Sequence, residues 1–454
     1  MSGLLSLHDL RAAADAGQID TVTAACIDMQ GRLMGKRFHV DHFLDSAHEE
    51  THGCTYLLAT DLEMSTIDGY KAASWSRGYG DYVLKPDLAT LRRLPWLAGT
   101  AMVLCDILDH HHAPVPHSPR ALLQAQAARL AERGWTAMAA PELEFFLFRE
   151  SYEVAQAAAH RGLTTFSAYN QDYHVFQGFK EEGLMRLLRN HLRGADIPVE
   201  NTKGEADAGQ SELNVRYADA LTMADRHAIM KTATKEIAWS QGRALTFMAK
   251  WSTRHAGSSC HVHMSMADAE GRPLFHDPAA PHGMSDLMRH WLAGLIAHAP
   301  EITLFLAPYV NSYKRFVAGT FAPTRLVWSL DNRTAGFRVV GEDTRAVRAE
   351  CRIGGADLCP HLAYAALIAA GLAGVDRGLA LPDPYDGDAY AAEAVPEIPR
   401  TLREAMAAAD RSELLRGAFG DDVVDHYLRA AAWELEECDR VVTDWDLARG
   451  FERA

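Results

Sequence analysis

Apolar runs separated by polar turns predict strands in the first quarter of the chain. Residues 22–29 (VTAACIDM) and 33–40 (LMGKRFHV) flank the triplet QGR, whose Gly31 suits a tight turn. The two segments therefore predict a β-hairpin. Residues 69–82 are dense in glycine, aromatic and charged residues without a hydrophobic period, which is typical of a long surface loop. The apolar run 101–108 (AMVLCDIL) predicts a further strand.

A polar, proline-broken stretch follows at 109–119 (DHHHAPVPHSP), and we place a domain boundary there, between residues 1–112 and 113–454. The length of 454 residues favours two domains, because a single hydrophobic core rarely supports a chain of this size. We interpret the triple histidine at 110–112 as part of a linker rather than as a metal site, because prolines break the stretch that follows it.

Helical periods become frequent beyond this stretch. Ser118 as a cap, Pro119 in the first turn and Gly134 at the end predict a helix, in which apolar residues recur at helical spacing. Residues 401–410 and 422–441 carry the longest helical patterns. With the strands, these patterns predict a mixed helix and strand fold.

Composition narrows the classes of function. Hydrophobic residues make up 48% and charged residues 23% of the chain, as in a globular protein that folds fully. A net charge of −15 argues against nucleic-acid binding, and no signal pattern or membrane-length apolar run occurs. We therefore predict a cytoplasmic protein without membrane contact. Seven scattered cysteines without CxxC spacing predict reduced thiols.

Two pairs of glutamates are the first candidate chemistry. In the predicted strand 141–148 (PELEFFLF), Glu142 and Glu144 point to one face, where their charges repel unless a cation, a proton or an arginine shares the site. Glu205 and Glu212 lie seven residues apart in GEADAGQSE, so the chain must turn near its glycine to bring both to one site. Glu142 and Glu144 could instead face water at a strand edge, and the spacing of Glu205 and Glu212 is a weak signal on its own.

Histidines and arginines add to this set. In SSCHVHMS, His261, His263 and Ser265 share one strand face, and in RAECRI Glu350 and Arg352 do the same. Arginines cluster between residues 315 and 348, where they suit a phosphate or carboxylate as well as ordinary ion pairs; they are Arg315, Arg333, Arg338, Arg345 and Arg348. No P-loop and no GxSxG motif occurs. The set predicts magnesium chemistry on a phosphorylated substrate.

The order of these motifs resembles the glutamine synthetase family, in its bacterial type I-like branch. The resemblance runs almost end to end, through GDYVLKPDLATLRRLPW, PELEFFLF, GEADAGQSELNV, GSSCHVHMS, NSYKRFVAGTFAP, NRTAGFR, RAECRI and VTDWDLARGFER. It implies an α+β fold with an N-terminal β-grasp domain and a catalytic domain built on an antiparallel sheet flanked by helices. It also implies a homo-oligomer of stacked hexameric rings, a dodecamer, with active sites between neighbouring subunits.

The resemblance assigns roles residue by residue. It implies two or more Mg²⁺ or Mn²⁺ ions, one held by Glu144, Glu205 and Glu212 and another by Glu142, His261 and Glu350. It implies glutamate binding by Gly257, Arg315 and Arg352, and ATP binding by His263, Ser265, Arg333 and Arg345. Arg333, Arg338 and Asp68 stand at catalytic positions, and the small-molecule substrates are L-glutamate, ATP and an amine. The implied reaction activates the γ-carboxylate of glutamate as a phosphate anhydride, which an amine then attacks.

The chain departs from the glutamine-forming pattern at the ammonium site. Phe321 occupies the position of the glutamate that accepts the ammonium proton, and residues 68–71 (DGYK) replace an Asp-Gly-Ser-Ser segment. Ala256 replaces the asparagine before the glutamate-binding glycine, and Tyr390 lies outside any adenylylation segment. These departures resemble the γ-glutamylamine synthetase branch. An aromatic amine pocket is predicted from Tyr70, Trp75, Tyr79, Phe321 and Trp328.

We therefore expect an ATP-dependent ligase that joins the γ-carboxylate of glutamate to ethanolamine, an alkylamine or a polyamine. One alternative is a glutamine synthetase with a rebuilt ammonium site. Another is an inactive structural or regulatory member, against which the six retained metal-ligand positions argue. The sequence leaves open the amine, the choice between magnesium and manganese, and the choice between six and twelve subunits.

Overall fold

A computed structural model describes residues 3–454, and its smaller part is a five-stranded sheet at the N-terminus. The strands lie in the order β2-β1-β5-β4-β3, and their bounds are β1 Thr21–Ile27, β2 Leu33–His39, β3 Thr51–Cys54, β4 Asp81–Arg93 and β5 Thr100–Leu108. The β1–β2 hairpin is confirmed, with Gly31 at a φ of +77° in its turn. β1 and β5 pair in parallel and the other neighbours are antiparallel. Short helices flank this sheet: α1 Leu7–Asp15, α2 Val40–His42 and a π-helical turn Phe43–Ala47.

The larger part is a nine-stranded sheet with the main path β12-β13-β14-β11-β6-β8-β7, while β9 and β10 pair with β6. Its strands are β6 Trp135–Leu147, β7 Val199–Gly204, β8 Gln210–Val215, β9 Ala218–Asp219, β10 Leu245–Thr246, β11 Cys260–Asp268, β12 Trp328–Leu330, β13 Phe337–Val340 and β14 Arg348–Cys351. All pairs are antiparallel except β12–β13. The α+β prediction with an antiparallel sheet flanked by helices is confirmed, with this one parallel pair added.

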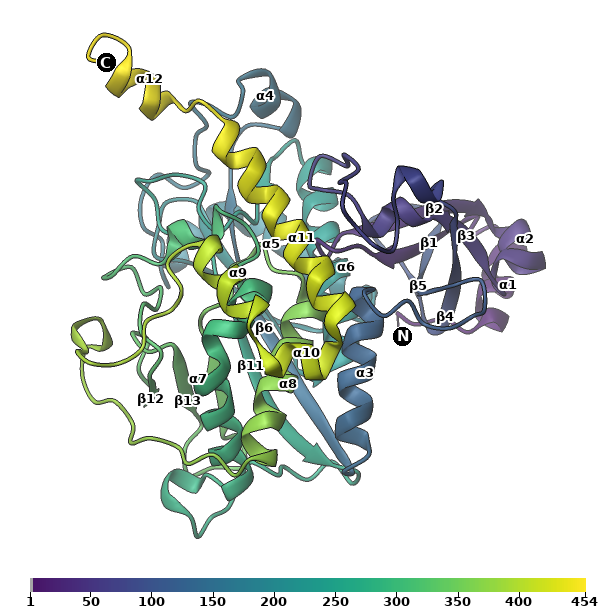
Figure 1. Cartoon of the computed structure of the whole chain (residues 1–454). Coiled ribbons are helices and arrows are strands. Elements are labelled where there is room, and N and C mark those ends of the chain that lie inside the picture. The colour runs from purple at the N-terminus through teal and green to yellow at the C-terminus, as the bar shows by residue number, and fades with distance from the viewer. Residues whose placement is uncertain (1–2) are drawn as a thin grey trace.

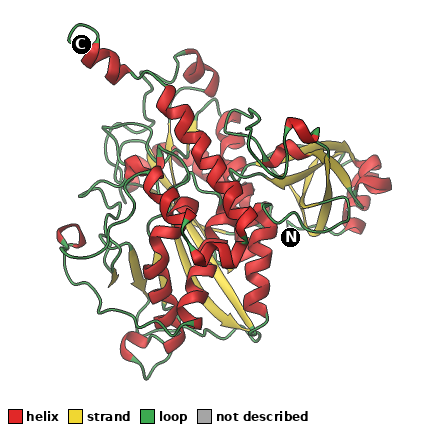
Figure 2. Cartoon of the chain, viewed as in Figure 1, coloured by secondary structure: helices red, strands yellow, loops and turns green. Residues whose placement is uncertain are grey.

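Helices cover one face of the nine-stranded sheet (Figures 1 and 2). This part of the chain contains α3 Pro119–Ala131, α4 Tyr152–Ala157, α5 Val175–Gly194, α6 Ala220–Ser240, α7 Asp286–Leu306, α8 Pro360–Asp376, α9 Leu402–Asp410, α10 Glu413–Phe419, α11 Asp421–Arg440 and α12 Asp444–Gly450. Of these, α12 lies on a projecting C-terminal arm and not over the sheet (Figure 1). Residues 360–374 of α8 are buried without exception, because α8 packs between α3, α6 and α7 at the centre of the core.

Two local predictions from the sequence agree only in part with the structure. Helix α3 begins at Pro119 as predicted, but the Ser118 side chain accepts no hydrogen bond from the first turn, so only its position is that of a cap. Part of the segment predicted as a surface loop, residues 69–82, is anchored, since Tyr70 and Ala73 are buried there. The chain passes between the sheets through residues 109–118, and the division into two domains at 112/113 stays a prediction.

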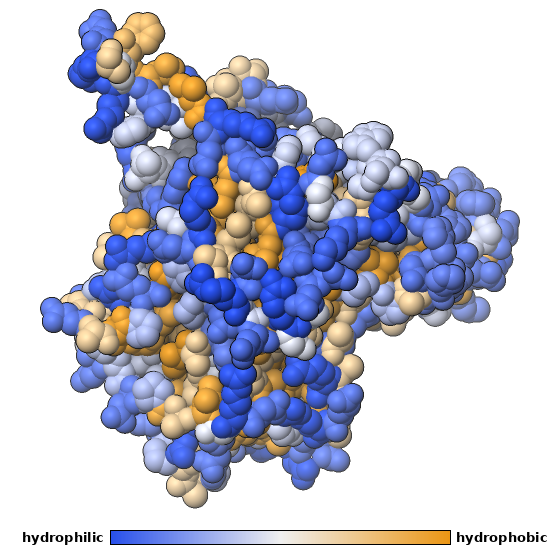
Figure 3. All heavy atoms as spheres, in the orientation of Figure 1, coloured by the Kyte–Doolittle hydropathy of each residue, from blue (hydrophilic) through white to orange (hydrophobic). Residues whose placement is uncertain are grey.

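The surface seen in Figure 3 is largely polar, with apolar side chains on the projecting C-terminal arm. Exposed apolar residues of this arm are Val441, Val442, Trp445, Leu447 and Phe451. In the described range 3–454, no helix combines the length and apolar character needed to cross a membrane. All seven cysteines are free thiols, as predicted.

Candidate active site

Strand register gathers the predicted side chains on the sheet face that the helices leave open. Glu142 of β6 lies opposite His261 of β11, and Glu144 lies opposite Glu212 of β8. On the other side of β11, His263 lies opposite Glu350 of β14, which in turn lies opposite Arg338 of β13. Because directly paired residues of antiparallel strands share a face, one face carries carboxylates, imidazoles and a guanidinium in neighbouring rows.

The first cluster consists of Glu144, Glu205 and Glu212, whose ligand atoms lie within 4.8 Å of one another. Glu205 joins it because the chain turns between β7 and β8, with Gly209 at a φ of +76°. This turn confirms the predicted reversal near the glycine. Lys203 forms an ion pair with Glu205, and the sequence did not indicate this cation.

Hydrogen bonds fix one carboxylate of this cluster. The backbone N–H and the hydroxyl of Ser259 donate to Glu144 at 2.7 and 2.5 Å, and the Gln210 amide donates to it at 3.0 Å. Burial, and then the charge of Glu205, raise the pKa of Glu144 to about 8. The same two causes raise the pKa of Glu212 to about 9. Three oxygen donors that resist simultaneous ionisation fit a divalent cation, which would compensate their charge.

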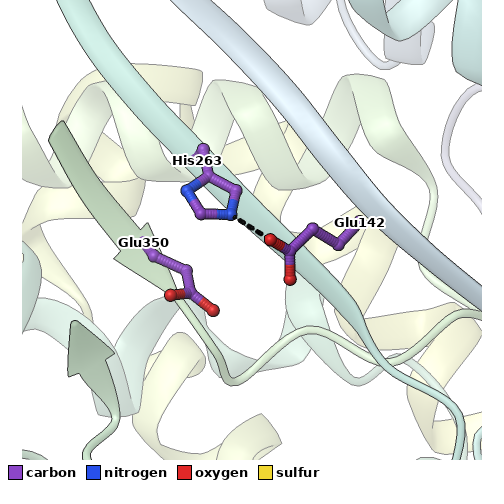
Figure 4. Close-up of side chains that lie close together, drawn as sticks. All are labelled: Glu142, His263 and Glu350. Carbon is purple, nitrogen blue, oxygen red and sulfur yellow. Dashed lines mark hydrogen bonds and ion pairs between the residues drawn. The ribbon is translucent and has the colours of Figure 1, made fainter. Parts of the chain in front are cut away.

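The second cluster contains Glu142, His263 and Glu350, again with ligand atoms within 4.8 Å of one another (Figure 4). Nε2 of His263 lies 2.8 Å from Oε1 of Glu142. Nδ1 of His261 lies 3.1 Å from Oε2 of Glu142 and 3.4 Å from Oε1 of Glu350. The sequence predicted His261 as a metal ligand and His263 as a nucleotide contact, and the structure places both rings against Glu142.

The protonation of the second cluster also suits a cation. Burial favours the neutral form of Glu142, but hydrogen bonds with both histidines outweigh it and hold the pKa of Glu142 well below its usual range. Burial and Arg352 lower the pKa of His261 to about 4, so its ring is neutral near pH 7 and one ring nitrogen has a lone pair to offer. Nε of Arg348 donates to Nδ1 of His263 at 3.2 Å, which places the proton of this ring on Nε2, where it donates to Glu142. In this arrangement His261, and not His263, is the imidazole that can offer a lone pair to a cation.

Arginines surround the second cluster. Glu350 is fully buried, accepts from Arg338 at 3.0 Å and also accepts from Arg352. Burial raises the pKa of Glu350, but Arg352 and then His261 outweigh this effect and lower it. Arg338 also donates to Asp331 at 3.1 Å, so its guanidinium bridges the sheet and the neighbouring loop.

Two cavities meet at Glu142. The first contains the first cluster, with Glu142, His261, Gly257 and the arginines Arg315, Arg333, Arg338 and Arg352 in its lining. The second is lined by Glu142 together with His263, Ser265, Arg345 and Arg348. The residues predicted for glutamate thus line the first cavity. Those predicted for ATP line the second, except Arg333, which lines the first.

Gly257 and Arg315 lie in close contact in the first cavity. A Cβ atom at Gly257 would lie 2.3 Å from Cγ of Arg315, so only glycine allows this approach. Arg315 is 2% exposed and donates to the carbonyl of Arg352 at 3.2 Å, and its Nε has no hydrogen-bond partner within residues 3–454. A guanidinium held in this way is positioned for an anionic group.

Phe321 lies over the first cavity. Its side chain is 57% exposed, and its φ of +57° is a left-handed conformation that a bulky residue adopts at a cost of about 1 kcal/mol or more. Its carbonyl accepts from Arg352 at 3.3 Å. The loop therefore presents an uncharged ring at the position where the resemblance to glutamine-forming proteins implied a carboxylate.

The other residues predicted for the amine do not join Phe321 within this chain. Tyr70 is buried with its ring stacked on His426 at 4.2 Å, and Trp328 is buried in the sheet core. Trp75 is exposed and packs edge-on against Tyr79 at 5.1 Å. Asp68 is exposed and lines neither cavity.

Sequence reasoning missed Tyr173 and Lys203, which line the first cavity beside Glu205. Nζ of Lys203 lies 4.3 Å from the centre of the Tyr173 ring. Tyr173 stands in a polar segment without hydrophobic period, so no pattern singled it out. The sequence could have indicated Ser259, because this residue lies within the SSCHVHMS motif.

The chain is similar to known proteins along almost its whole length. The model of the glutamine synthetase catalytic domain matches residues 116–450. The γ-glutamylethanolamide synthetase GlnA4 of Streptomyces coelicolor is 50% identical over 450 residues, which cover 99% of this chain and 96% of the relative. The glutamate–isopropylamine ligase of a Pseudomonas species is 36% identical over 436 residues, 95% of both chains. A solved structure of GmaS with ADP has a TM-score of 0.84 at 26% identity, covering 98% of this chain and 99% of that one. The chain belongs to the glutamine synthetase family.

Proposed function

We propose that the protein is an ATP-dependent ligase that joins the γ-carboxylate of L-glutamate to a primary organic amine. The observation that carries the proposal is a pair of cavities that meet at Glu142, with Phe321 rather than a carboxylate over the first. The names of the two relatives support an organic amine, since one is a γ-glutamylethanolamide synthetase and the other a glutamate–isopropylamine ligase.

Members of this family use ATP and divalent metals, and both carboxylate clusters fit such ions. Glu144, Glu205 and Glu212 would hold one ion, and Glu142, His261 and Glu350 another, with His263 beside it. Oxygen-rich clusters favour Mg²⁺ over softer metals, and Mn²⁺ accepts the same ligands. When bound, these ions would neutralise the charge of the transferring phosphoryl group.

The chain's own residues then bind and orient the substrates. In this proposal Arg315, Arg352 and the backbone at Gly257 hold the carboxylates of glutamate, and Arg345 and Ser265 contact ATP. Arg333 and Arg338 face the first cavity and would stabilise negative charge on the phosphoryl oxygens during transfer. The γ-carboxylate oxygen displaces ADP from the γ-phosphate. The amine, which binds as an ammonium ion, gives up one proton to become a nucleophile, and its nitrogen then displaces phosphate from the γ-glutamyl phosphate and loses a second proton.

The amine site is completed by a neighbouring subunit in this proposal. Asp68, Trp75 and Tyr79 lie outside both cavities of their own chain, which supports a role for them in another subunit's site, as the resemblance to the family implies. We infer a homo-oligomer of stacked hexameric rings on this basis. Phe321 would then offer apolar contact to the carbon tail of the amine, and Asp68 would bind its ammonium form.

Phosphate release from ATP tests the proposal. The enzyme is assayed with glutamate and Mg²⁺ across ammonium, methylamine, ethanolamine, isopropylamine, putrescine and spermine. We expect strong release with at least one organic amine and little with ammonium. Release with ammonium alone would mean that the protein is a glutamine synthetase, and no release with any amine would contradict the ligase function.

A further inference from the structure

A third cavity, called here the side cavity, opens beside the first cavity between α5 and the edge strand β7. Tyr173 and Lys203 line both cavities and so form the wall that they share. Phe179 and Met185 of α5 give the side cavity apolar walls. An elongated molecule that passes the Tyr173 ring could therefore occupy both cavities at once.

Glu181 is the polar feature that points to a ligand. Its side chain lines the side cavity although the residue is only 2% exposed. Oε2 of Glu181 accepts from the hydroxyl of Ser211 at 2.8 Å, whereas Oε1 accepts no hydrogen bond from any described residue. A buried carboxylate oxygen without a donor destabilises the fold, so a donor from outside the chain would improve the site.

The cations of the side cavity are already engaged elsewhere. Lys203 pairs with Glu205 and lies 3.0 Å from Asp172. Arg189 pairs with Glu182 and donates to Thr202 at 2.7 Å. Neither cation contacts Glu181, and burial raises the pKa of Glu181 although Ser211 and the nearby Gln171 lower it in part. Among the side chains that line this cavity, Glu181 is thus the carboxylate that lacks a cationic partner.

We propose that the side cavity binds the second ammonium group of a linear diamine or polyamine substrate, with Glu181 as its acceptor. The inference rests on the proposed ligase function and specifies the amine. The reacting nitrogen lies in the first cavity, the carbon chain passes the Tyr173 ring, and the far ammonium donates to Oε1 of Glu181. The aromatic rings of Tyr173 and Phe179 add cation–π attraction for that group.

A chain-length series tests this arrangement. The full-length enzyme is assayed with diamines from 1,2-diaminoethane to 1,6-diaminohexane and with monoamines of matched length. At the best length we expect kcat/KM for the diamine to exceed that of the monoamine about tenfold, because a buried charge-assisted hydrogen bond discriminates strongly. Glu181→Gln should reduce this ratio to about one while the KM for glutamate and the kcat with monoamines stay within about twofold.

Two further variants keep the test decisive. Glu182→Gln is the matched control, since Glu182 lines the same cavity but is paired with Arg189, and it should leave the ratio unchanged. Gly178→Leu fills the side cavity without touching the carboxylate, because a Cβ atom at Gly178 meets no atom within 4 Å, and it should lower the ratio as Glu181→Gln does.

The outcomes separate this inference from the function on which it rests. A diamine-to-monoamine ratio near one in the unmodified enzyme, or a ratio unchanged by both Glu181→Gln and Gly178→Leu, would overturn the inference while monoamine activity upheld the ligase. If the enzyme released no phosphate from ATP with any of the amines, the proposed function itself would be contradicted.

Discussion

At the scale of single residues, Phe321 is the side chain whose chemistry bears most directly on the choice of amine. An uncharged ring neither attracts ammonium nor accepts its proton, whereas a carboxylate does both. We expect Phe321→Glu to raise the ratio of kcat/KM for ammonium to kcat/KM for the best organic amine about tenfold or more. Phe321→Leu is the control and should leave ammonium unused. Equal ratios in the Glu and Leu variants would show that this position does not select the amine.

Glu144 allows a residue-scale test of the first metal site. A ligand that binds only the folded protein stabilises it, by about 2.7 kcal/mol at a hundred times its dissociation constant. We expect Mg²⁺ with ATP to raise the melting temperature, and Glu144→Ala to lose a large part of that rise because it removes one donor of the cluster. Glu132→Ala, at the exposed end of α3, should keep the full rise. Equal rises in both variants would exclude Glu144 as a ligand.

At the scale of elements, α11 holds the segment that carries Asp68. The contacts follow one helical face and comprise Asp422 and Asp425 with Lys71, His426 with Tyr70 and Leu58, Arg429 with Asp68, and Trp433 with Asp61. The distance from Nε of Arg429 to the carbonyl oxygen of Asp68 is 2.7 Å. Because these contacts recur at helical spacing, α11 acts as a rigid support for the segment.

Removing one contact of this face should therefore weaken the binding of the amine rather than the binding of ATP. We expect Arg429→Ala to raise the KM for the amine about fivefold, with the KM for ATP and the melting temperature little changed. Arg429→Lys should restore part of the loss. Arg403→Ala, which removes an exposed ion pair with Asp439 of the same helix, is the matched control and should behave as the unmodified enzyme. A uniform loss for all substrates would indicate a structural role instead.

The contact between α11 and the N-terminal part also predicts a dependence of stability on pH. His117 lies 4.3 Å from His426, ring to ring, and its Nε2 is 3.1 Å from the Tyr82 hydroxyl. Burial lowers the pKa of His117 to about 4. At His117 the folded state therefore binds fewer protons than the unfolded chain between about pH 6.5 and pH 4, so the contribution of this group to stability falls as the pH falls through this range, by about 3 kcal/mol. Melting temperatures of His117→Gln should decline less steeply there, and an unchanged slope would contradict the assignment.

At the scale of the whole molecule, the sequence predicted which residues share a face within one strand, but not which residues of neighbouring strands lie opposite one another. The i, i+2 pairs identified Glu142 with Glu144 and His261 with His263, because alternation within a strand is local. That Glu142 faces His261 depends on pairing between strands more than a hundred residues apart, which no local pattern encodes. Tyr70 was placed in an open pocket because its burial depends on α11, more than 350 residues away. The side cavity depends on packing of α5 against β7 and left no signal in the sequence.

The assembly itself is testable, because the proposed site draws on two subunits. Suppose that Arg315 acts in its own subunit and Asp68 acts in its neighbour's site. An assembly in which every subunit carries Arg315→Ala is then impaired, and so is one in which every subunit carries Asp68→Ala. Random mixing in equal amounts places both intact residues at about one site in four. We expect co-expressed, doubly tagged mixtures to regain about a quarter of full activity. A mixture of Arg315→Ala with Glu144→Ala should regain none, since both residues line one cavity of one chain. Equal activity of the two mixtures would mean that Asp68 serves no neighbouring site.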